Sequence, residues 1–292
     1  LYSKFIKTEN SVYYAIVINK NPSLNISNGL EYKTIKIDAS NVYNVEIASN
    51  QEIEGNEKNT TFAGFLRKVY LINENSSIMT TFIEKVKSET AFFPYKTKFI
   101  ISCENDLIFC PDDATINVKS FINKTTTTIW KSNSKITNIT ANSDFKVFAF
   151  STIDNFVSVH SLNNGCEVNQ IDVVNDVDYM IFTRKWSFLC IFSFSTISIL
   201  NVDGEVLKIC PDFNEKVIFA DSFTSINGFD YIIYQNDRYQ VFFFEAFYPD
   251  KRKLIVGANS ELRSSWHDRM ASCIIFIYAN GLVQLQPFSL VE

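Results

Sequence analysis

Short hydrophobic runs alternate with polar turn residues along most of this chain, and they return at a nearly constant spacing. The first series of runs starts at Val147, Phe188, Tyr231 and Cys273. The second series starts at Ile116, Val157, Ile197, Gln240 and Leu282. The steps within both series lie between 40 and 43 residues. A repeat of about 40–45 residues that holds several short strands is typical of a β-propeller blade.

The unit from Ile136 to Val173 shows the expected blade most clearly. Polar turns separate four hydrophobic segments, at 136–140, 147–152, 157–162 and 167–173. The last turn contains Asn-Gly, a strong hairpin signal because both residues tolerate positive φ. A second glycine, Gly204, follows Gly165 by 39 residues and takes the same place in the next unit. The turns therefore support the same period as the hydrophobic runs.

The period also predicts the number of blades. A length of 292 residues divided by about 42 gives close to seven units. We therefore expect an all-β chain, residues 1–292, that forms a single WD-repeat-like propeller of seven four-stranded blades. The blades are clear from about residue 100 to 292. The first 100 residues are less regular, with strands expected from Tyr13, Tyr32, Val69 and Ile78 and a polar loop at 50–61. Pairing of the N-terminal strand with the last blade would hide the seam of such a ring.

Composition narrows the functional classes. The net charge of −5 and the pI near 5.3 argue against nucleic-acid binding, which requires a basic surface. The six cysteines form no CxxC pair, and we expect buried free thiols in a reducing compartment. No hydrophobic stretch is long enough to be a membrane-spanning helix.

Three segments carry a family resemblance: SDFKVFAFSTIDNFVSVHSLNNG from Ser143, TISILNVDGEVLK from Thr196 and YPDKRKLI from Tyr248. From Ile136 to its end, the chain resembles the C-terminal WD-repeat propeller of BEACH-domain proteins, protist members included. The resemblance implies a protein-binding module of a larger cytoplasmic factor in vesicle and lysosome trafficking. The chain departs from regular WD repeats, because no Trp-Asp dipeptide ends a third strand and no Gly-His opens a blade.

Catalytic and metal-binding motifs are absent from the sequence. His160 lies within an expected strand, and His267 has no evident nucleophile to serve. The adjacent pair Asp112 and Asp113 cannot supply the separation that paired acid and base carboxylates need. The chain has no P-loop, GxGxxG or HExxH sequence. We expect no catalytic residue, no cofactor and no metal.

The turns predict one candidate binding surface. In an antiparallel blade the first-to-second and third-to-fourth turns lie at the same end, so basic and aromatic residues of these turns should share one rim. Arginine and tryptophan are enriched at binding hot spots. The predicted rim residues are Arg184, Lys185, Trp186, Lys251, Arg252, Lys253, Trp266 and Arg269.

These observations predict a non-catalytic platform for protein partners. A basic rim would suit an acidic partner or peripheral contact with an anionic membrane, and no nucleic acid is expected. Two alternatives stay open. A glycosidase-like propeller hydrolase would need converging carboxylates in a central pocket, and a coat or nuclear-pore-like scaffold would show apolar patches on the outer edge of a blade.

Overall fold

The computed structural model describes two compact units, residues 1–131 and 132–292, which are treated separately. Below residue 92 it describes the backbone of eight strands; from 99 to 287 it omits 104–105, 121–124, 132, 143, 164, 174 and 269–272. Side chains are described at 99, at 101 and, within the latter ranges, from 108 onward except at 268. The loop predicted at 50–61 lies outside the described residues.

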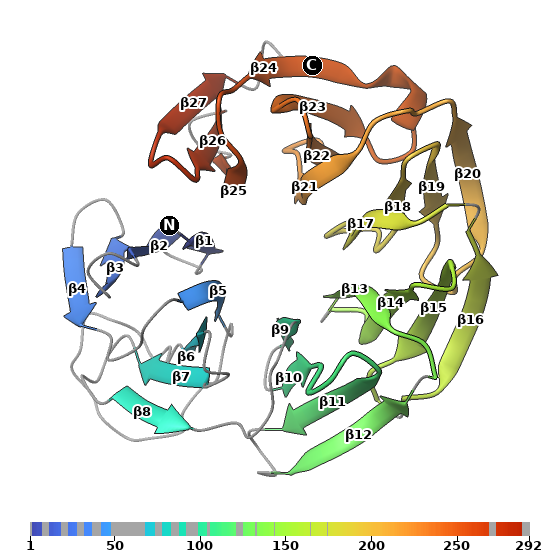
Figure 1. Ribbon diagram of the computed structural model, residues 1–292. Coiled ribbons are helices and arrows are strands. Elements are labelled where there is room, and N and C mark those ends of the chain that lie inside the picture. Colours follow the sequence, from blue (N-terminus) through green and yellow to red (C-terminus); the bar gives the residue numbers. More distant parts are fainter. Residues whose placement is uncertain are drawn as a thin grey trace. The chain divides into compact units, whose positions relative to one another are not determined.

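Seven antiparallel sheets form among the described residues, six with four strands and one with three (Figure 1). We number them 1 to 7 along the chain; in each, the strands are neighbours in sequence order. In unit 1, sheet 1 consists of β1 (Tyr2–Lys7), β2 (Val12–Ile18), β3 (Ser23–Ser27) and β4 (Tyr32–Lys36). Sheet 2 consists of β5 (Val42–Ile47), β6 (Lys68–Asn73), β7 (Ile78–Phe82) and β8 (Ser88–Ala91). Sheet 3 consists of β9 (Ile100–Cys103), β10 (Asp106–Phe109), β11 (Thr115–Ser120) and β12 (Thr126–Lys131).

Unit 2 contains the other four sheets. Sheet 4 consists of β13 (Ile136–Asn142), β14 (Val147–Thr152), β15 (Phe156–Ser161) and β16 (Glu167–Asp172). Sheet 5 consists of β17 (Val177–Phe182), β18 (Leu189–Ser193), β19 (Thr196–Leu200) and β20 (Val206–Pro211). Sheet 6 consists of β21 (Val217–Thr224), β22 (Asp230–Asn236), β23 (Gln240–Glu245) and β24 (Lys253–Gly257), and the 3₁₀ turn η1 (Pro249–Lys251) lies between its last two strands. Sheet 7 consists of β25 (Leu262–Asp268), β26 (Cys273–Tyr278) and β27 (Val283–Pro287). No described helix has the length and apolar content needed to cross a membrane.

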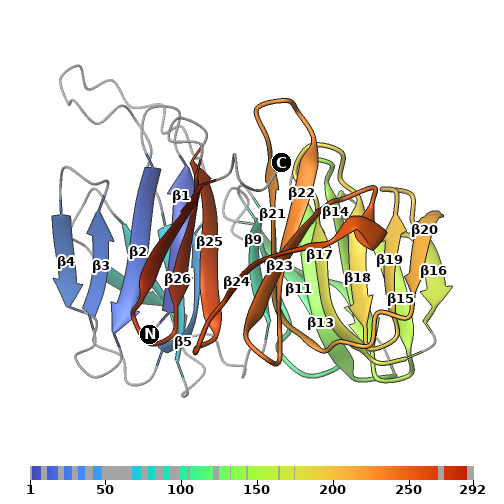
Figure 2. The same cartoon turned by 90° about the horizontal axis from the view of Figure 1, so that it is seen from above.

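The first series of hydrophobic runs forms second strands of these sheets, and the second series forms third strands. All six residues of β14 and all five of β18 are buried, which explains their continuous hydrophobicity. The fourth strands are the most exposed; β16 and β20 each bury at most one residue. In unit 2 the first strands β13, β17 and β21 pack against one another, while β16 and β20 are outermost (Figures 1 and 2).

The N-terminal strand begins a sheet of its own. β1 pairs with β2 along its whole length and is the first strand of its own sheet. Sheet 7 has three strands in the described part of the chain, with β27 at its edge. Closure of a ring between the first and last sheets stays a prediction.

Turn geometry in unit 2 keeps the same period as the strands. In the turns from first to second strand, Lys146, Ser187 and Gly228 follow one another at steps of 41 residues. Their φ angles are 54°, 54° and 82°, so all three adopt the left-handed conformation. Only the last of them is the glycine that this conformation favours.

Hydrogen bonds between neighbouring sheets also recur at about one repeat length. The Asn138 side chain donates to the carbonyl of Val177 at 2.8 Å, and Ser222 donates to that of Phe182 at 3.0 Å. The Asn142 amide donates to the carbonyl of Thr183 at 3.0 Å. The repeat thus fixes side-chain contacts between sheets as well as strand positions.

Candidate rim pocket

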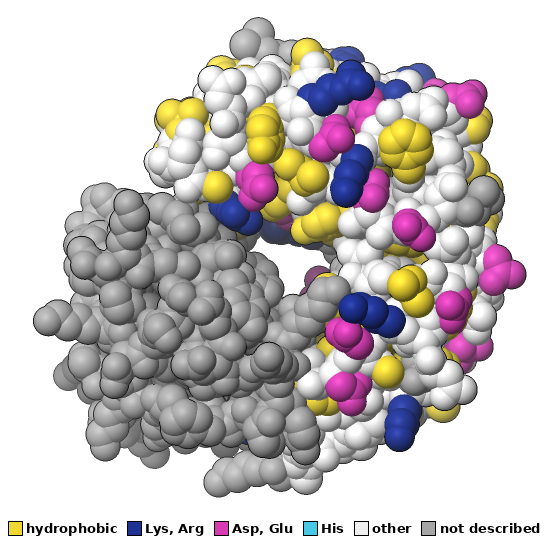
Figure 3. All heavy atoms as spheres, in the orientation of Figure 1, with side chains coloured by type: hydrophobic (Ala, Val, Ile, Leu, Met, Phe, Trp, Pro, Cys, Tyr) yellow, Lys and Arg dark blue, Asp and Glu magenta, His cyan; other side chains and the backbone are white. Residues whose placement is uncertain are grey.

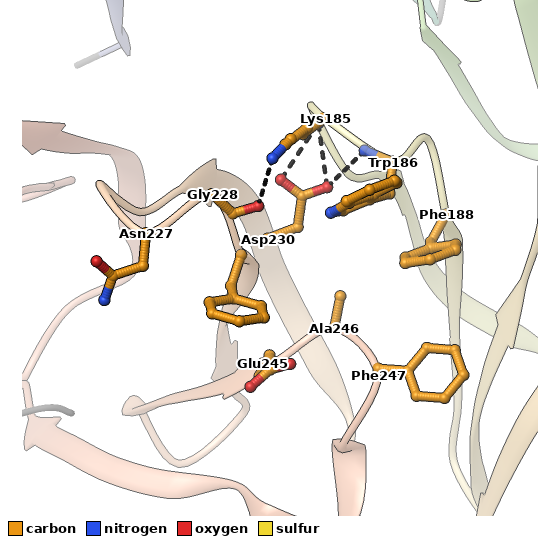
Figure 4. Close-up of a pocket in the computed structure, with 10 residues that line it drawn as sticks. Lys185, Trp186, Phe188, Asn227, Gly228, Asp230, Glu245, Ala246 and Phe247 are labelled. Atoms are coloured by element: carbon orange, nitrogen blue, oxygen red, sulfur yellow. Dashed lines mark hydrogen bonds between the residues drawn. The ribbon is translucent and has the colours of Figure 1, made fainter.

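Three connections of unit 2 meet around a pocket at one end of sheets 5 and 6 (Figure 4). They are the β17–β18 loop, the β21–β22 turn and the segment that follows β23. The pocket has a volume of about 270 Å³. Its lining residues are Lys185, Trp186, Phe188, Asn227, Gly228, Phe229, Asp230, Glu245, Ala246 and Phe247. First-to-second and third-to-fourth connections therefore share one end of the sheets, as the antiparallel pattern predicts.

Asp230 anchors the β17–β18 loop to sheet 6. Its carboxylate is 2% exposed and accepts the Trp186 amide at 2.8 Å. The Lys185 amide lies 3.0 and 3.2 Å from its two oxygens, and the Thr224 hydroxyl donates to it at 2.6 Å. A buried carboxylate that accepts backbone N–H groups holds a loop strongly, since hydrogen bonds to a charged acceptor exceed neutral ones. Asp230 therefore positions Lys185 and Trp186.

The same loop is closed internally. The Thr183 amide donates to the Phe188 carbonyl at 2.8 Å, and the Phe188 amide donates to the Thr183 hydroxyl at 3.0 Å. Ser187, between them, is fully buried in the left-handed conformation, and its hydroxyl has no hydrogen-bond partner among the described residues. The loop accordingly carries local strain, which its contacts with sheet 6 outweigh.

Lys185 folds back over the pocket wall. Its ammonium donates to the Gly228 carbonyl at 3.1 Å and lies 5.0 Å from the centre of the Trp186 ring. Gly228 leaves it room: a Cβ there would lie 2.6 Å from Nζ. The ammonium is therefore already engaged by a carbonyl and an aromatic face.

Aromatic side chains give the pocket an exposed apolar lining. Trp186, Phe229 and Phe247 are 54%, 50% and 43% exposed. The Phe188 and Phe247 rings lie 5.9 Å apart, which links the β17–β18 loop to the segment after β23. Clustered exposed aromatic groups mark protein interaction sites more often than scattered ones.

Several of the predicted basic residues form bonds within the chain. Arg184 lies 3.7 Å from Asp221, and Arg252 lies 3.7 Å from Glu215 with its guanidinium 5.3 Å from the Phe213 ring. These ion pairs neutralise part of the positive charge that the sequence suggested for the rim.

Glu215 also lies next to buried Tyr234, whose hydroxyl donates to it at 3.4 Å. Burial, together with that carboxylate, raises the pKa of Tyr234. The Tyr234 hydroxyl therefore stays neutral at physiological pH. The ion pair between Arg252 and Glu215 joins the start of β24 to the β20–β21 connection.

Two lysines, Lys208 of β20 and Lys251 of η1, lie against the Tyr248 ring. The Lys251 and Lys208 ammonium groups lie 4.7 and 5.2 Å from its ring centre. Lys208 also donates to Asp250 at 2.6 Å, and this bond lowers the pKa of that carboxyl. Lys253 lies 5.9 Å from the Phe243 ring at the start of β24.

The predicted position of Trp266 is wrong. The residue belongs to β25 and is 8% exposed, so its ring packs inside the sheet instead of facing a partner. Trp186, by contrast, lies in a turn and is 54% exposed. Arg269 lies outside the described residues.

The described side chains in Figure 3 show mixed charge. Lys and Arg side chains alternate with Asp and Glu side chains, and hydrophobic groups lie between them.

Exposed apolar side chains also lie on the outer strands. The exposed apolar residues of these strands are Val168 of β16, Val206, Leu207 and Ile209 of β20, and Leu254 of β24.

Two of the residues considered above for catalysis, His160 and Asp112, form hydrogen bonds within the chain. His160 is fully buried, with Nε2 at 2.7 Å from the Ser158 hydroxyl and Nδ1 at 3.1 Å from the Gly165 carbonyl. Burial lowers its pKa, against the opposing effects of Gly165 and Glu167. Asp112 caps the turn before β11 by accepting from Ala114 and Thr115.

The part of the chain that the structure describes contains no assembled metal site and no disulfide. No cluster of three His, Cys, Asp or Glu residues there could hold a metal ion. Of the five cysteines with described side chains, Cys166 is exposed; the other four are buried, and none forms a disulfide.

Comparison with known proteins defines the fold. No protein-family model and no curated protein matches the chain. Two solved structures of BBS1N in complex with ARL6DN, one soaked with mercury and one with lead, match it with a TM-score of 0.67 each. The first is 10% identical and the alignment covers 98% of this chain and 91% of that one; the second is 9% identical, with 99% and 92% covered. The chain has a β-propeller-like fold. At this identity the likeness concerns the fold alone.

Proposed function

We propose that this protein is a non-catalytic platform for protein partners, and that its seven sheets are the blades of one propeller. The rim pocket carries the proposal, because it combines exposed aromatic rings with a loop fixed in place by Asp230. Preorganised aromatic groups bind with little loss of conformational entropy. The similar structures of BBS1N in complex with ARL6DN support a partner-binding role for this fold.

A photo-reactive amino acid at Asn227, which lines the pocket, tests this function. The same group at Asp154, an exposed residue of the β14–β15 turn, is the control. We expect cross-links to a protein partner from position 227 that disappear with Trp186→Ala or Phe247→Ala. Equal yields from both positions, or yields that ignore these substitutions, would contradict the proposal.

The more specific parts of the proposal rest on sequence. Membership of a BEACH-type trafficking factor, a cytoplasmic location and contact with an acidic partner or an anionic membrane follow from the resemblance and from the basic loops. Arg184 and Arg252 are ion-paired within the chain, so we place the main contact on the aromatic pocket. Co-sedimentation of the chain with phosphatidylserine vesicles tests the membrane contact, and Lys251→Glu should reduce it most at low salt.

A scaffold is the second candidate, and one observation favours it. Val206, Leu207 and Ile209 are 46%, 40% and 54% exposed along the outer strand β20. Apolar side chains on an outer strand suit lateral contacts between subunits. Concentration-dependent association of the purified chain that Ile209→Lys abolishes would support this candidate, and a monomer at all concentrations would oppose lateral self-contact.

A further inference from the structure

One charged side chain of the rim pocket has no hydrogen-bond or ion-pair partner among the described residues. The Glu245 side chain is half-buried at the end of β23, and no hydrogen bond or ion pair joins its carboxylate to a described residue. Figure 4 shows Glu245 and Lys185 at opposite ends of the pocket. A carboxylate beside apolar rings gains more from a cation than one in open solvent, because water screens it less.

The remaining charges of the pocket are already engaged. Lys185 is bonded to Gly228 and covers one side of Trp186, while Asp230 accepts three donors. Among the lining residues there are one ammonium and two carboxylates, which gives a formal charge of 1 − 2 = −1. The pocket is therefore complementary to a cation, and Glu245 is the group available to bind it.

We infer that the rim pocket binds an arginine side chain of a protein partner, with the guanidinium on Glu245 and against the aromatic rings. This inference rests on the proposed platform function. A guanidinium is planar and weakly hydrated, stacks on aromatic faces and bonds a carboxylate through two parallel N–H groups. A lysine ammonium is a strongly hydrated point charge and fits this lining less well.

The size of the pocket agrees with a single side chain. Its volume of about 270 Å³ lies below the range of roughly 300–1,000 Å³ that encloses drug-sized ligands. Its aromatic walls come from all three connections, through Trp186, Phe229 and Phe247, so the guest would lie between these rings.

The test uses the full chain and three small probes at constant ionic strength: the N-acetyl methylamides of arginine, leucine and glutamate. The chain has three tryptophans, so three indole N–H signals are expected in a ¹⁵N–¹H spectrum. Trp186→Phe identifies the signal of the pocket. Probes of this size bind with dissociation constants of about 0.3–1 mM at ordinary ligand efficiency, so each is titrated to about 50 mM.

We expect the arginine probe to shift the Trp186 indole signal in a saturable manner and the glutamate probe to leave it unchanged. Glu245→Gln should weaken arginine binding about tenfold, since a charge-assisted pair is lost. Glu205→Gln, at an exposed turn residue outside the pocket, should have no effect. The Glu245 carboxylate has no hydrogen bond or ion pair to a described residue, so we expect Glu245→Gln to leave the fold intact.

Two results would overturn the inference. If the leucine probe binds as well as arginine and Glu245→Gln changes nothing, the pocket accepts an apolar group, and the platform function stands without the arginine. If no probe shifts the signal, the pocket binds no arginine side chain. The cross-linking experiment at Asn227 then decides separately whether this end of the sheets binds a partner.

Discussion

The Asp230 carboxylate should determine both the stability of unit 2 and the order of the β17–β18 loop. Asp230→Ala removes the acceptor of three donors: the amides of Lys185 and Trp186 and the hydroxyl of Thr224. Hydrogen bonds to a charged group contribute about 1.5–3 kcal/mol each, and less where water can replace the acceptor. Both amides belong to exposed residues, so we take about 1 kcal/mol per donor and expect a loss of about 3 kcal/mol.

Urea unfolding followed by circular dichroism measures this loss. With a slope near 3 kcal/mol/M for a chain of this size, the midpoint should fall by about 1 M. Asp230→Asn keeps one acceptor oxygen, so its midpoint should fall by less. Asp154→Ala makes the same chemical change in an exposed turn and should stay within about 0.5 kcal/mol of the wild type.

Hydrogen exchange provides a local readout under native conditions. The peptide that contains residues 183–188 should exchange faster in Asp230→Ala, while one that contains β14 should not change. If the midpoint of Asp230→Ala matches that of Asp154→Ala, or if exchange at 183–188 stays slow, the buried carboxylate does not anchor the loop.

Three further substitutions test neighbouring features. Gly228→Ala should destabilise the fold by about 1–2 kcal/mol, since its φ of 82° is unfavourable for alanine and its Cβ would lie 2.6 Å from Lys185 Nζ. The double variant with Lys185→Ala should lose less stability than the sum of the two single variants. Additive losses in urea unfolding would refute the clash. Ser187→Gly should stabilise by about 1 kcal/mol, because it relieves left-handed strain and removes an unbonded buried hydroxyl; a lower melting temperature would contradict this. Folding lowers the pKa of His160, so the unfolded chain binds its proton more tightly, and stability is lost as the pH falls below the unfolded pKa of about 6.5. His160→Gln should flatten the decline of the melting temperature between pH 7.5 and 5.5, and identical declines would show that His160 does not cause it.

The β architecture could be predicted from the sequence because buried strands leave an uninterrupted signal. The run that begins at Val147 is strand β14, and the run at Cys273 is β26, each within the bounds that the hydrophobic pattern predicts. Both faces of such a strand are buried, so nearly every position must be hydrophobic. The strands expected from Tyr13, Tyr32, Val69 and Ile78 also form. A single domain for the whole chain stays a prediction.

The candidate site was predictable only in part. The antiparallel pattern correctly places Lys185 and Trp186 at the same end of the sheets as the connection after β23. It does not show which side chains of that end remain exposed. Trp266 and Trp186 lie beside similar polar neighbours in the sequence. Trp266 pairs with Ile275 inside a sheet and is buried, whereas Trp186 lies in the β17–β18 loop and is exposed.

The aromatic lining and its anchor were missed for a physical reason. Phe229 and Phe247 follow turns in a chain with 27 phenylalanines, so neither stands out by composition. Asp230 opens the hydrophobic run of β22, and an acidic residue at that position was the available signal. The loop amides that it binds lie about 45 residues earlier, between β17 and β18, and short-range patterns carry no information on such contacts.

The hydrogen bonds between successive sheets of unit 2 have a consequence for how such a chain can change during evolution. In the bonds from Asn138, Asn142 and Ser222, one sheet supplies a side chain but its neighbour supplies only a main-chain carbonyl. Any amino acid offers that carbonyl, so the accepting position is free to mutate as long as the strand keeps its register. Half of each contact is thus independent of residue identity, which allows the stacking of sheets to persist while the sequence of the accepting strand changes.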